Sequence, residues 1–227
     1  MTSESGSSDI DNSWLVPDNF DALKFLTICS RYLSCCPQAK PMTIRTTLDH
    51  IAFLVTSLDD ALEEMDQFDL EKQAVQSFPG EGTRECYLGA PSLAGRLLLI
   101  ESAGDGPYED ALARRGPGLH HVALAVEDLD GFIAQVVCAS PWLVHPRSFE
   151  TRQQVNTIWL ARPGVETLVE CMEVNELSEK AHAVEHITIA GLDIRDGLAS
   201  IFGDVGIGVS AGPRSGVTVN DRFIGSP

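Results

Sequence analysis

The sequence predicts an α+β fold in which two βαβββ modules form one cupped mixed sheet, followed by an incomplete third module. The prediction rests on a repeat. A short apolar phrase containing a histidine recurs at residues 48–52, 120–123 and 185–188. The first two copies are followed by similar tails, 55–59 and 126–130, and then by a helical pattern. Because one module cannot bury both faces of its sheet, we expect the two complete copies to pack edge to edge.

The first module is predicted as a strand, a helix and further strands. The β-branched and apolar run His50–Val55 indicates a strand, and Asp59 is a candidate N-cap for a helix that ends near Phe68. Glycines at 80 and 82 mark a turn. The module continues with the strands Arg84–Leu88 and Arg96–Ile100 and with a connecting helix over 107–115.

The second module repeats this order. Leu119–Val126 is predicted as a strand, and Leu129–Val137 as the helix that follows it. The Arg-Pro-Gly sequence at 162–164 marks a turn between the last two strands, Val155–Leu160 and Thr167–Met172.

The rest of the chain divides around these two modules. Residues 1–42 are expected to be a partly disordered extension with one helix over 18–34. Residues 43–176 form the two-module domain, and 177–227 the partial third module.

The third module contains fewer predicted elements than the others. We expect a strand at His186–Ala190, a helix at Asp196–Phe202 and one further strand at Val217–Val219. Such a segment can cover a sheet edge, pair two subunits or be a remnant. The sequence leaves these alternatives open.

Charge and composition exclude several classes of partner. The chain carries 16 basic and 33 acidic residues, and its formal net charge is −17. This charge opposes binding to nucleic acid and to anionic membrane surfaces, although a metal and a few arginines can still dominate a cleft locally. No run of 18 apolar residues is present, so a spanning helix is not expected. Six cysteines without CxxC spacing favour reduced thiols and a cytoplasmic protein.

Three residues form a candidate metal site. His50 and His121 occupy the same position in their repeats, 71 residues apart. Glu170 lies within an apolar strand, where an unpaired carboxylate would be costly. Two neutral imidazoles and one carboxylate make a site for a divalent metal. We therefore predict that His50, His121 and Glu170 converge on one ion.

The remaining histidines receive structural interpretations. Strand alternation places His120 on the opposite face from its neighbour His121, where we expect it to have a structural role or to support a metal ligand. His186 is the counterpart in the third module, but it lacks the rest of a module and is not expected to be a ligand. His145 and His182 lie in loop-like segments and receive no functional role.

Residues 46–173 resemble the vicinal oxygen chelate superfamily, which includes glyoxalases, bleomycin resistance proteins and dioxygenases. Within it they are most similar to methylmalonyl-CoA epimerases. The likeness covers a little over half of the chain. It is carried by the segment Leu48–Ala52 with Leu58–Ala61, by Pro79–Glu85, and by Arg114–Val122 with its Leu-His-His sequence.

The resemblance implies a metal-dependent racemase or epimerase. His50, His121 and Glu170 match the family's ligand positions for a divalent metal such as Co, Mn, Zn or Fe. Glu85 matches an acid/base carboxylate. In such enzymes the metal binds two oxygens of a malonyl-type thioester and stabilises the enolate. Glu85 and Glu170 would then remove the proton from one side and return it on the other.

The chain departs from the family at two places. The family's fourth ligand, a Gln or Glu, aligns with Leu98, which cannot bind a metal. Glu101 is three residues further and is expected to face the other way. The segment 150–154 replaces a Gly-rich loop that is usual in the epimerases.

Two other functions remain open. Two histidines and one carboxylate with free positions are also the ligand set of non-haem Fe(II) enzymes, so an extradiol-type dioxygenase is one alternative. A non-catalytic module that binds a small ligand is the other.

The resemblance also implies the partners. These are a small acyl or dicarbonyl substrate, with a CoA thioester as one form, and a second copy of the chain as a homodimer. Four arginines could meet CoA phosphates: Arg84, Arg96, Arg114 and Arg115.

Overall fold

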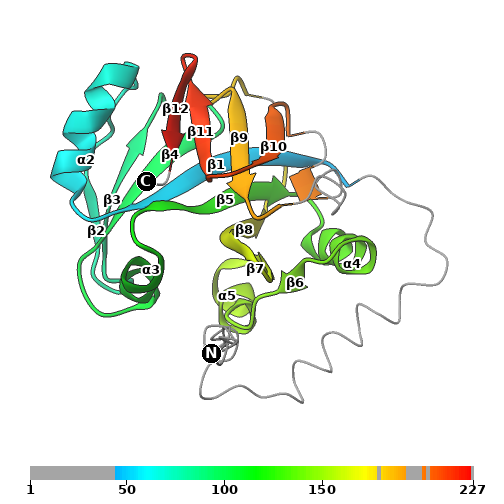
Figure 1. Ribbon diagram of the computed structural model, residues 1–227. Helices are drawn as coiled ribbons and strands as arrows, with labels where there is room; N and C mark the ends of the chain where they lie inside the picture. Colours follow the sequence, from blue (N-terminus) through cyan, green and yellow to red (C-terminus); the bar gives the residue numbers. More distant parts are fainter. Residues whose placement is uncertain (1–43, 178–179, 193–200, 203–204, 226–227) are drawn as a thin grey trace, which may run out of the picture.

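The computed structural model describes residues 44–177, 180–192, 201–202 and 205–225. Within these residues the chain forms an eight-stranded mixed sheet, a four-stranded sheet and a few short helices (Figure 1). The α+β fold class is confirmed. The helix predicted over 18–34 and the extension that contains it lie outside the described residues. Every helix in the described part of the chain is too short or too polar to cross a membrane.

The first module contains the predicted elements and one additional strand, β2, whose three residues are all exposed. Its first helix is capped by Ser57 and not by Asp59, because the Ser57 hydroxyl accepts a hydrogen bond from the backbone N–H of Asp60 at 3.3 Å. The elements are β1 (Thr46–Val55), α2 (Leu58–Met65), the 3₁₀ turn η2 (Asp66–Phe68), β2 (Gln76–Phe78), β3 (Thr83–Leu88), β4 (Arg96–Ser102) and α3 (Pro107–Arg115).

The second module differs from the prediction between its first helix and its third strand. Val155, predicted to begin a strand, ends a short polar helix. The helix is attached to the following strand, because the Ser148 hydroxyl accepts a hydrogen bond from the Trp159 backbone N–H at 2.8 Å. The helix thus depends on a tertiary contact that periodicity does not show. The elements are β5 (Gly118–Val126), α4 (Leu129–Ala139), β6 (Leu143–Val144), α5 (Ser148–Val155), β7 (Thr157–Arg162) and β8 (Val165–Glu173).

The two modules join through their first strands. β1 pairs antiparallel with β5, and each pairs in parallel with the last strand of its own module, β4 or β8. The sheet order is therefore β2-β3-β4-β1-β5-β8-β7-β6, in which one half mirrors the other. The expected edge-to-edge packing is confirmed.

The C-terminal segment forms the smaller sheet from β9 (His186–Ala190), β10 (Gly208–Gly212), β11 (Gly216–Val219) and β12 (Arg222–Gly225). The sequence predicts β9 and β11 but neither of the others. β9 lies between parallel β10 and antiparallel β11, the same combination of neighbours that β1 and β5 have in the large sheet. Most of the helix predicted at Asp196–Phe202 lies outside the described residues, although 201 and 202 are helical.

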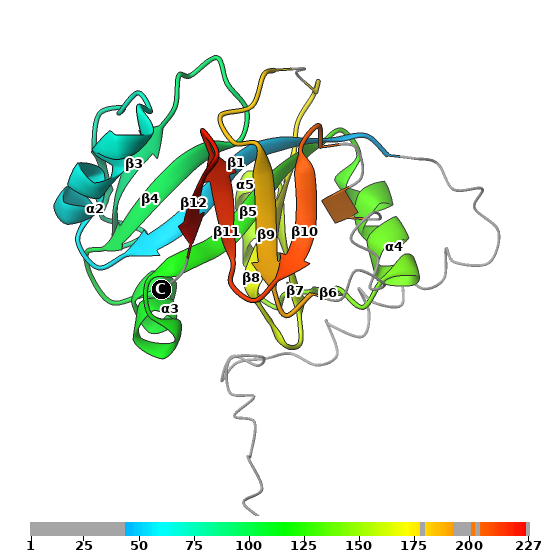
Figure 2. The ribbon, with the colours of Figure 1, turned by 45° about the horizontal axis from the view of Figure 1, so that its top comes forward.

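The small sheet packs against one face of the large sheet, which we call the core face. Figure 2 shows it lying across β1 and β5, with α2 and α4 on either side. Ile187, Ile189, Val217 and Val219 of the small sheet share one apolar cluster with Ile51 and Val122 of the large sheet. The C-terminal segment therefore covers a face of the sheet.

The opposite face, which we call the site face, has a smaller apolar cluster. Ala52, Leu54, Leu98 and Ile100 of β1 and β4 pack there against Ala111 of α3. This cluster borders the predicted metal ligands, because His50 and Ala52 lie on the same side of β1.

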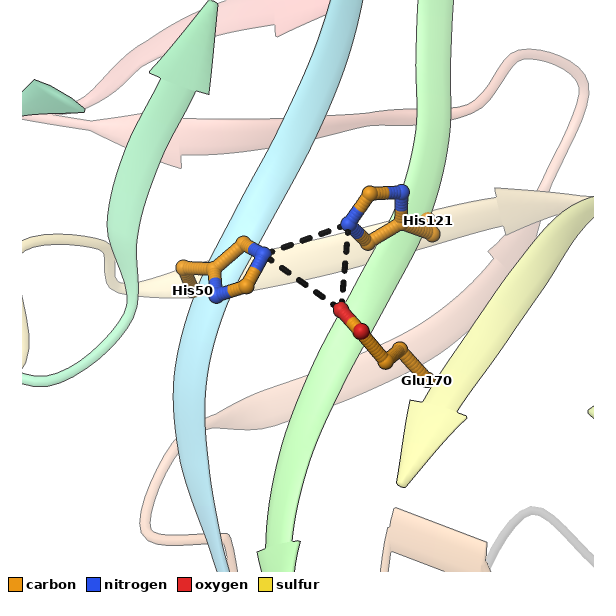
Figure 3. Close-up of side chains that lie close together, drawn as sticks. All are labelled: His50, His121 and Glu170. Atoms are coloured by element: carbon orange, nitrogen blue, oxygen red, sulfur yellow. Dashed lines mark hydrogen bonds and ion pairs between the residues drawn. The ribbon is translucent and has the colours of Figure 1, made fainter. Parts of the chain in front are cut away.

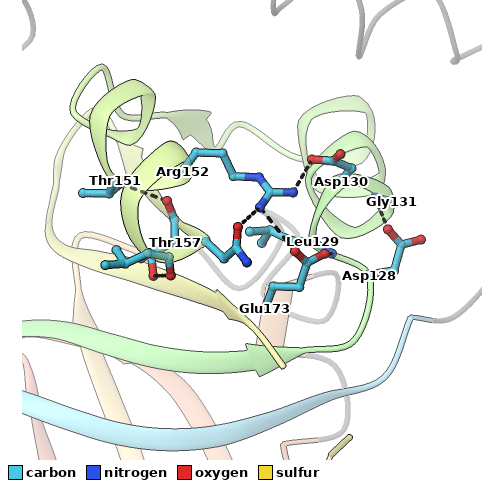
Figure 4. Close-up of polar contacts among 10 residues, drawn as sticks. Asp128, Leu129, Asp130, Gly131, Thr151, Arg152, Thr157 and Glu173 are labelled. Carbon is cyan, nitrogen blue, oxygen red and sulfur yellow. Dashed lines mark hydrogen bonds and ion pairs between the residues drawn. The ribbon is translucent and has the colours of Figure 1, made fainter. Parts of the chain in front are cut away.

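A polar network ties both helices of the second module to the end of β8 (Figure 4). Arg152 of α5 donates to Asn156 Oδ1 at 2.8 Å, to Glu173 Oε2 at 3.2 Å and to Asp130 Oδ1 of α4 at 3.4 Å. The other oxygen of Glu173 accepts a hydrogen bond from the Leu129 backbone N–H at 3.4 Å. Glu173 is three residues from Glu170, so the network holds the strand that carries that carboxylate.

Candidate metal centre

Three side chains from three adjacent strands converge on the site face (Figure 3). The Nε2 atoms of His50 on β1 and His121 on β5 lie 3.2 Å apart. Oε2 of Glu170 on β8 lies 3.6 Å from the first and 3.5 Å from the second. The side chains are only 7%, 2% and 15% exposed, in that order. The structure therefore brings together the two histidines that the repeat singled out and the carboxylate predicted from its apolar strand.

The spacing of these atoms fits a divalent metal. Ligand atoms bonded at about 2.1 Å in a tetrahedral site lie about 3.4 Å from one another. The three separations, 3.2, 3.5 and 3.6 Å, are close to this value. Two imidazole nitrogens and a carboxylate oxygen are also the donors that such ions take. That His50, His121 and Glu170 bind a metal stays a prediction.

Two β-bulges aim the imidazoles at each other. His50 pairs with Ala123, and His121 pairs with Ala52, but the register shifts by one residue just outside this segment. Asp49 and His120 are the extra residues, and each directly precedes a ligand candidate. The two strands thus use the same irregularity at equivalent positions.

The bulge also corrects the prediction for His120. Strict alternation would place it opposite His121, but its Nδ1 lies 2.8 Å from Nδ1 of His121. Its ring centroid lies 5.2 Å from that of Tyr108 on α3. The prediction is wrong because the extra residue interrupts the two-residue period of the strand.

The bulged residues contact the outer nitrogens of both imidazoles. Oδ2 of Asp49 lies 2.7 Å from Nδ1 of His50, and the hydrogen bond from His50 lowers the pKa of this carboxyl. His50 Nδ1–H therefore donates to a carboxylate and leaves Nε2 with a free lone pair. The partner of His121 is different, because burial lowers the pKa of His120 to about 3 and keeps it neutral.

Glycine 95 supports the first bulge. Its backbone N–H donates to the carbonyl oxygen of Asp49 at 2.9 Å. Its φ is +60°, and a Cβ there would lie 2.5 Å from Cδ2 of Leu48. Only glycine takes this conformation and this contact without strain.

The two carboxyls differ in their surroundings. Burial is the main cause that raises the pKa of Glu170 to about 7, and His50 partly opposes it. Burial also raises the pKa of Glu85, although the Thr83 hydroxyl donates to Glu85 Oε1 at 2.7 Å. Glu85 lies on β3, opposite Ile100 of β4, and is not one of the converging residues. Its catalytic role stays a prediction.

The fourth ligand position is occupied by a buried apolar side chain. Leu98 pairs with Ala52 of β1 and Tyr87 of β3, and it is 5% exposed. Glu101 does not replace it, because its Oε2 accepts a hydrogen bond from Arg84 Nη1 at 2.7 Å.

Aromatic rings surround the imidazoles. Tyr87 and Trp159 approach His50 and His121 edge-on, with ring centroids 5.7 and 5.0 Å apart respectively. The sequence predicted a supporting role for His120 but gave no indication of these rings or of Asp49 as a partner. The doublets Asp49-His50 and His120-His121 were the available signal, since both put a polar residue directly before a ligand candidate.

Comparison with known proteins finds a superfamily that part of the chain resembles. Residues 49–138 match the family model described as the Glyoxalase/Bleomycin resistance protein/Dioxygenase superfamily. A search of curated proteins found no match.

Solved structures of similar fold include a hypothetical protein from Bacillus halodurans C-125, with 20% identity over 60% of this chain and 99% of that chain and a TM-score of 0.46. Methylmalonyl-CoA epimerase from Mycobacterium tuberculosis has 21% identity over 60% of this chain and 92% of its own, with a TM-score of 0.41. The Streptomyces coelicolor epimerase in complex with 2-nitronate-propionyl-CoA has 23% identity over 56% and 98%, with a TM-score of 0.41. Residues 49–138, less than half of the chain, are thus similar to the glyoxalase/bleomycin resistance protein/dioxygenase superfamily.

Proposed function

We propose that the protein is a metal-dependent epimerase-type isomerase that moves a proton on a small acyl substrate, of which a CoA thioester is one form. The observation that carries the proposal is the convergence of His50 Nε2, His121 Nε2 and Glu170 Oε2 within 3.6 Å of one another. A carboxyl of raised pKa, Glu85, lies on the same sheet face.

His50, His121 and Glu170 would hold the metal. When bound, the divalent ion supplies a Lewis acid that polarises two substrate oxygens and makes the carbon between them more acidic. Both imidazoles act as neutral ligands, because their outer nitrogens are engaged by Asp49 and His120.

Glu85 and Glu170 are the proposed acid/base pair. They lie on β3 and β8, with three strands between them in the sheet order. Oε2 of Glu170 faces the imidazoles, and no described residue bonds its Oε1, which remains for the substrate. One carboxylate takes the proton from carbon while the other, initially protonated, returns its proton to the opposite side. Burial raises the pKa of the Glu85 carboxyl, which brings its proton exchange closer to neutral pH.

Exchange of the substrate α-proton with solvent deuterium tests this proposal. Metal-loaded protein is incubated with methylmalonyl-CoA in D₂O, and loss of the α-proton signal is followed by NMR. We expect exchange in the wild type, and at least a hundredfold slower exchange for Glu85→Gln with its metal content unchanged. The matched control Glu101→Gln should exchange normally. Wild-type protein that loads metal yet exchanges no proton from this or other malonyl-type thioesters would contradict the proposal.

A second candidate is an extradiol-type dioxygenase, which one observation favours. Leu98 leaves only three ligands, the number that non-haem Fe(II) enzymes use. Oxygen uptake by Fe(II)-loaded protein with catechol would decide for this function. A protein with no stoichiometric metal, unaffected in ligand binding by His121→Ala, would instead be a binding module.

A further inference from the structure

A cavity of about 210 Å³ adjoins the candidate metal centre. Arg96 of β4, one of its lining residues, is the direct strand partner of His50. Tyr87, another, places its ring centroid 5.7 Å from that of the same histidine. The cavity is lined by Gln73, Ala74, Gln76, Glu85, Tyr87 and Arg96.

Arg96 differs from the other arginines near the site. Its guanidinium carbon lies 4.2 Å from the centroid of the Tyr87 ring, and among the described residues no carboxylate forms an ion pair with it. Arg84, by contrast, pairs with Glu101, and Arg115 donates to the Glu166 carbonyl. Arg114 is exposed on α3. Arg96 is therefore an oriented cation with free donors at the wall of a cavity.

One anion that could compete for Arg96, Asp49, is already engaged. Asp49 is close enough for Arg96 to lower the pKa of its carboxyl, but Asp49 Oδ2 takes the Nδ1–H of His50 at 2.7 Å. Glu85 also lines the cavity, and burial raises its pKa. The cavity thus combines a cation with a potential proton acceptor.

We propose that this cavity binds a carboxylate of the substrate through Arg96, beyond the oxygens that reach the metal. The inference rests on the proposed function and narrows its substrate class to small organic acids with a second anionic group. A carboxylate matches the planar fork of a guanidinium, and its binding would turn the carbon chain towards Glu85. The face of the Tyr87 ring holds the Arg96 guanidinium in place through a cation–π contact.

The test compares succinate with monomethyl succinate as probes, by calorimetric titration of metal-loaded protein. The diacid can reach the metal and Arg96 together, whereas the monoester loses one charge. We expect wild type to bind succinate about tenfold more tightly, in line with charge-assisted hydrogen bonds. Arg96→Gln should remove this preference, and Arg96→Lys should keep part of it because it keeps the charge. Arg114→Gln is the control and should behave as wild type.

Metal content, measured on the same samples, separates this inference from the proposed function. Equal affinity for the two probes in wild type, or a preference that survives in Arg96→Gln, overturns the role of Arg96 even when metal is bound. If wild type loads no metal, the proposed function fails. The same titration on metal-free protein then tests the role of Arg96 by itself. Equal affinity for the two probes in wild type, or a preference that survives in Arg96→Gln, again overturns it.

Discussion

The two candidate imidazole ligands differ in what holds their outer nitrogens. His50 Nδ1 faces the carboxylate of Asp49, whereas His121 Nδ1 faces the neutral ring of His120. A carboxylate makes an imidazole a stronger donor to metal than a neutral partner does. We therefore expect His50 to be a stronger metal donor than His121, although the two residues occupy equivalent positions in the repeat.

This difference predicts unequal losses of metal affinity. Asp49→Asn should weaken Zn²⁺ binding by about 10- to 100-fold, because a neutral amide does not make the His50 imidazole as strong a metal donor as a carboxylate does. His120→Gln should weaken it less, since an amide can still accept the hydrogen bond from His121. Competition with a chromophoric chelator measures both. Equal affinity for wild type and Asp49→Asn would show that this carboxylate has no part in metal binding.

Glu170 predicts a pH dependence of stability in metal-free protein. Its pKa is raised from 4.5 to about 7 in the folded chain, so between these values the folded state holds a proton that the unfolded state has lost. The contribution of Glu170 to the free energy of unfolding therefore falls as the pH rises from 4.5 through about 7, by about 3 kcal/mol in total.

Glu170→Gln isolates this contribution. Gln resembles the protonated acid, so without metal the variant should match wild type near pH 4 and be more stable by up to about 3 kcal/mol at pH 8. Urea unfolding in the presence of EDTA gives the comparison. A stability difference between the variant and wild type that does not change with pH would contradict a raised pKa of the buried Glu170 carboxyl.

Among the elements, the bulged segment of β1 depends on one glycine, Gly95. Gly95→Ala puts a Cβ 2.5 Å from Leu48 Cδ2 at a φ of +60°. We expect a loss of about 2–4 kcal/mol in unfolding free energy from strain and overpacking. Metal affinity should fall as well, because Gly95 N–H fixes the carbonyl of Asp49. Gly164→Ala is a matched control, with φ +83° but no atom within 4 Å of its Cβ, and should lose about 1–2 kcal/mol with metal affinity unchanged.

The network around Arg152 should matter for stability and not for metal binding. Its partners are 30% and 66% exposed, so solvent screens the ion pairs. Arg152→Met should cost about 1 kcal/mol of unfolding free energy, with the stoichiometry of bound metal unchanged. A loss of metal together with this small destabilisation would show that the end of β8 positions Glu170 more tightly than we expect.

For the whole molecule, the two sheets share one apolar core. Ile187 of the small sheet is fully buried in the cluster that contains Ile51 of the large one. Ile187→Ala should therefore destabilise the entire chain by about 2–5 kcal/mol and leave one calorimetric transition. The half-exposed Phe223 is the control, and Phe223→Ala should cost less than about 1 kcal/mol. Two separate transitions would mean that the sheets unfold independently.

The sequence predicted the parts of the molecule that repeat and alternate. The strands of both modules and the meeting of His50 with His121 followed from equivalent positions in two copies, whereas Glu170 was predicted as a carboxylate within an apolar strand. The sequence could not show that Asp49 and His120 are extra residues, because a bulge is defined by the partner strand. Nor could it predict α5 or the flanking strands β10 and β12. Tertiary contacts hold that helix, and the strands are short and rich in glycine.

Metal stoichiometry tests the central claim most directly. Elemental analysis and Co²⁺ titration should give one divalent ion per chain for wild type, and less than a tenth of an ion for His50→Ala, His121→Ala and Glu170→Ala. His186→Ala, in the small sheet, should retain the full amount. Wild type and all three variants with the same metal content, or no metal in any of them, would contradict a centre formed by these residues.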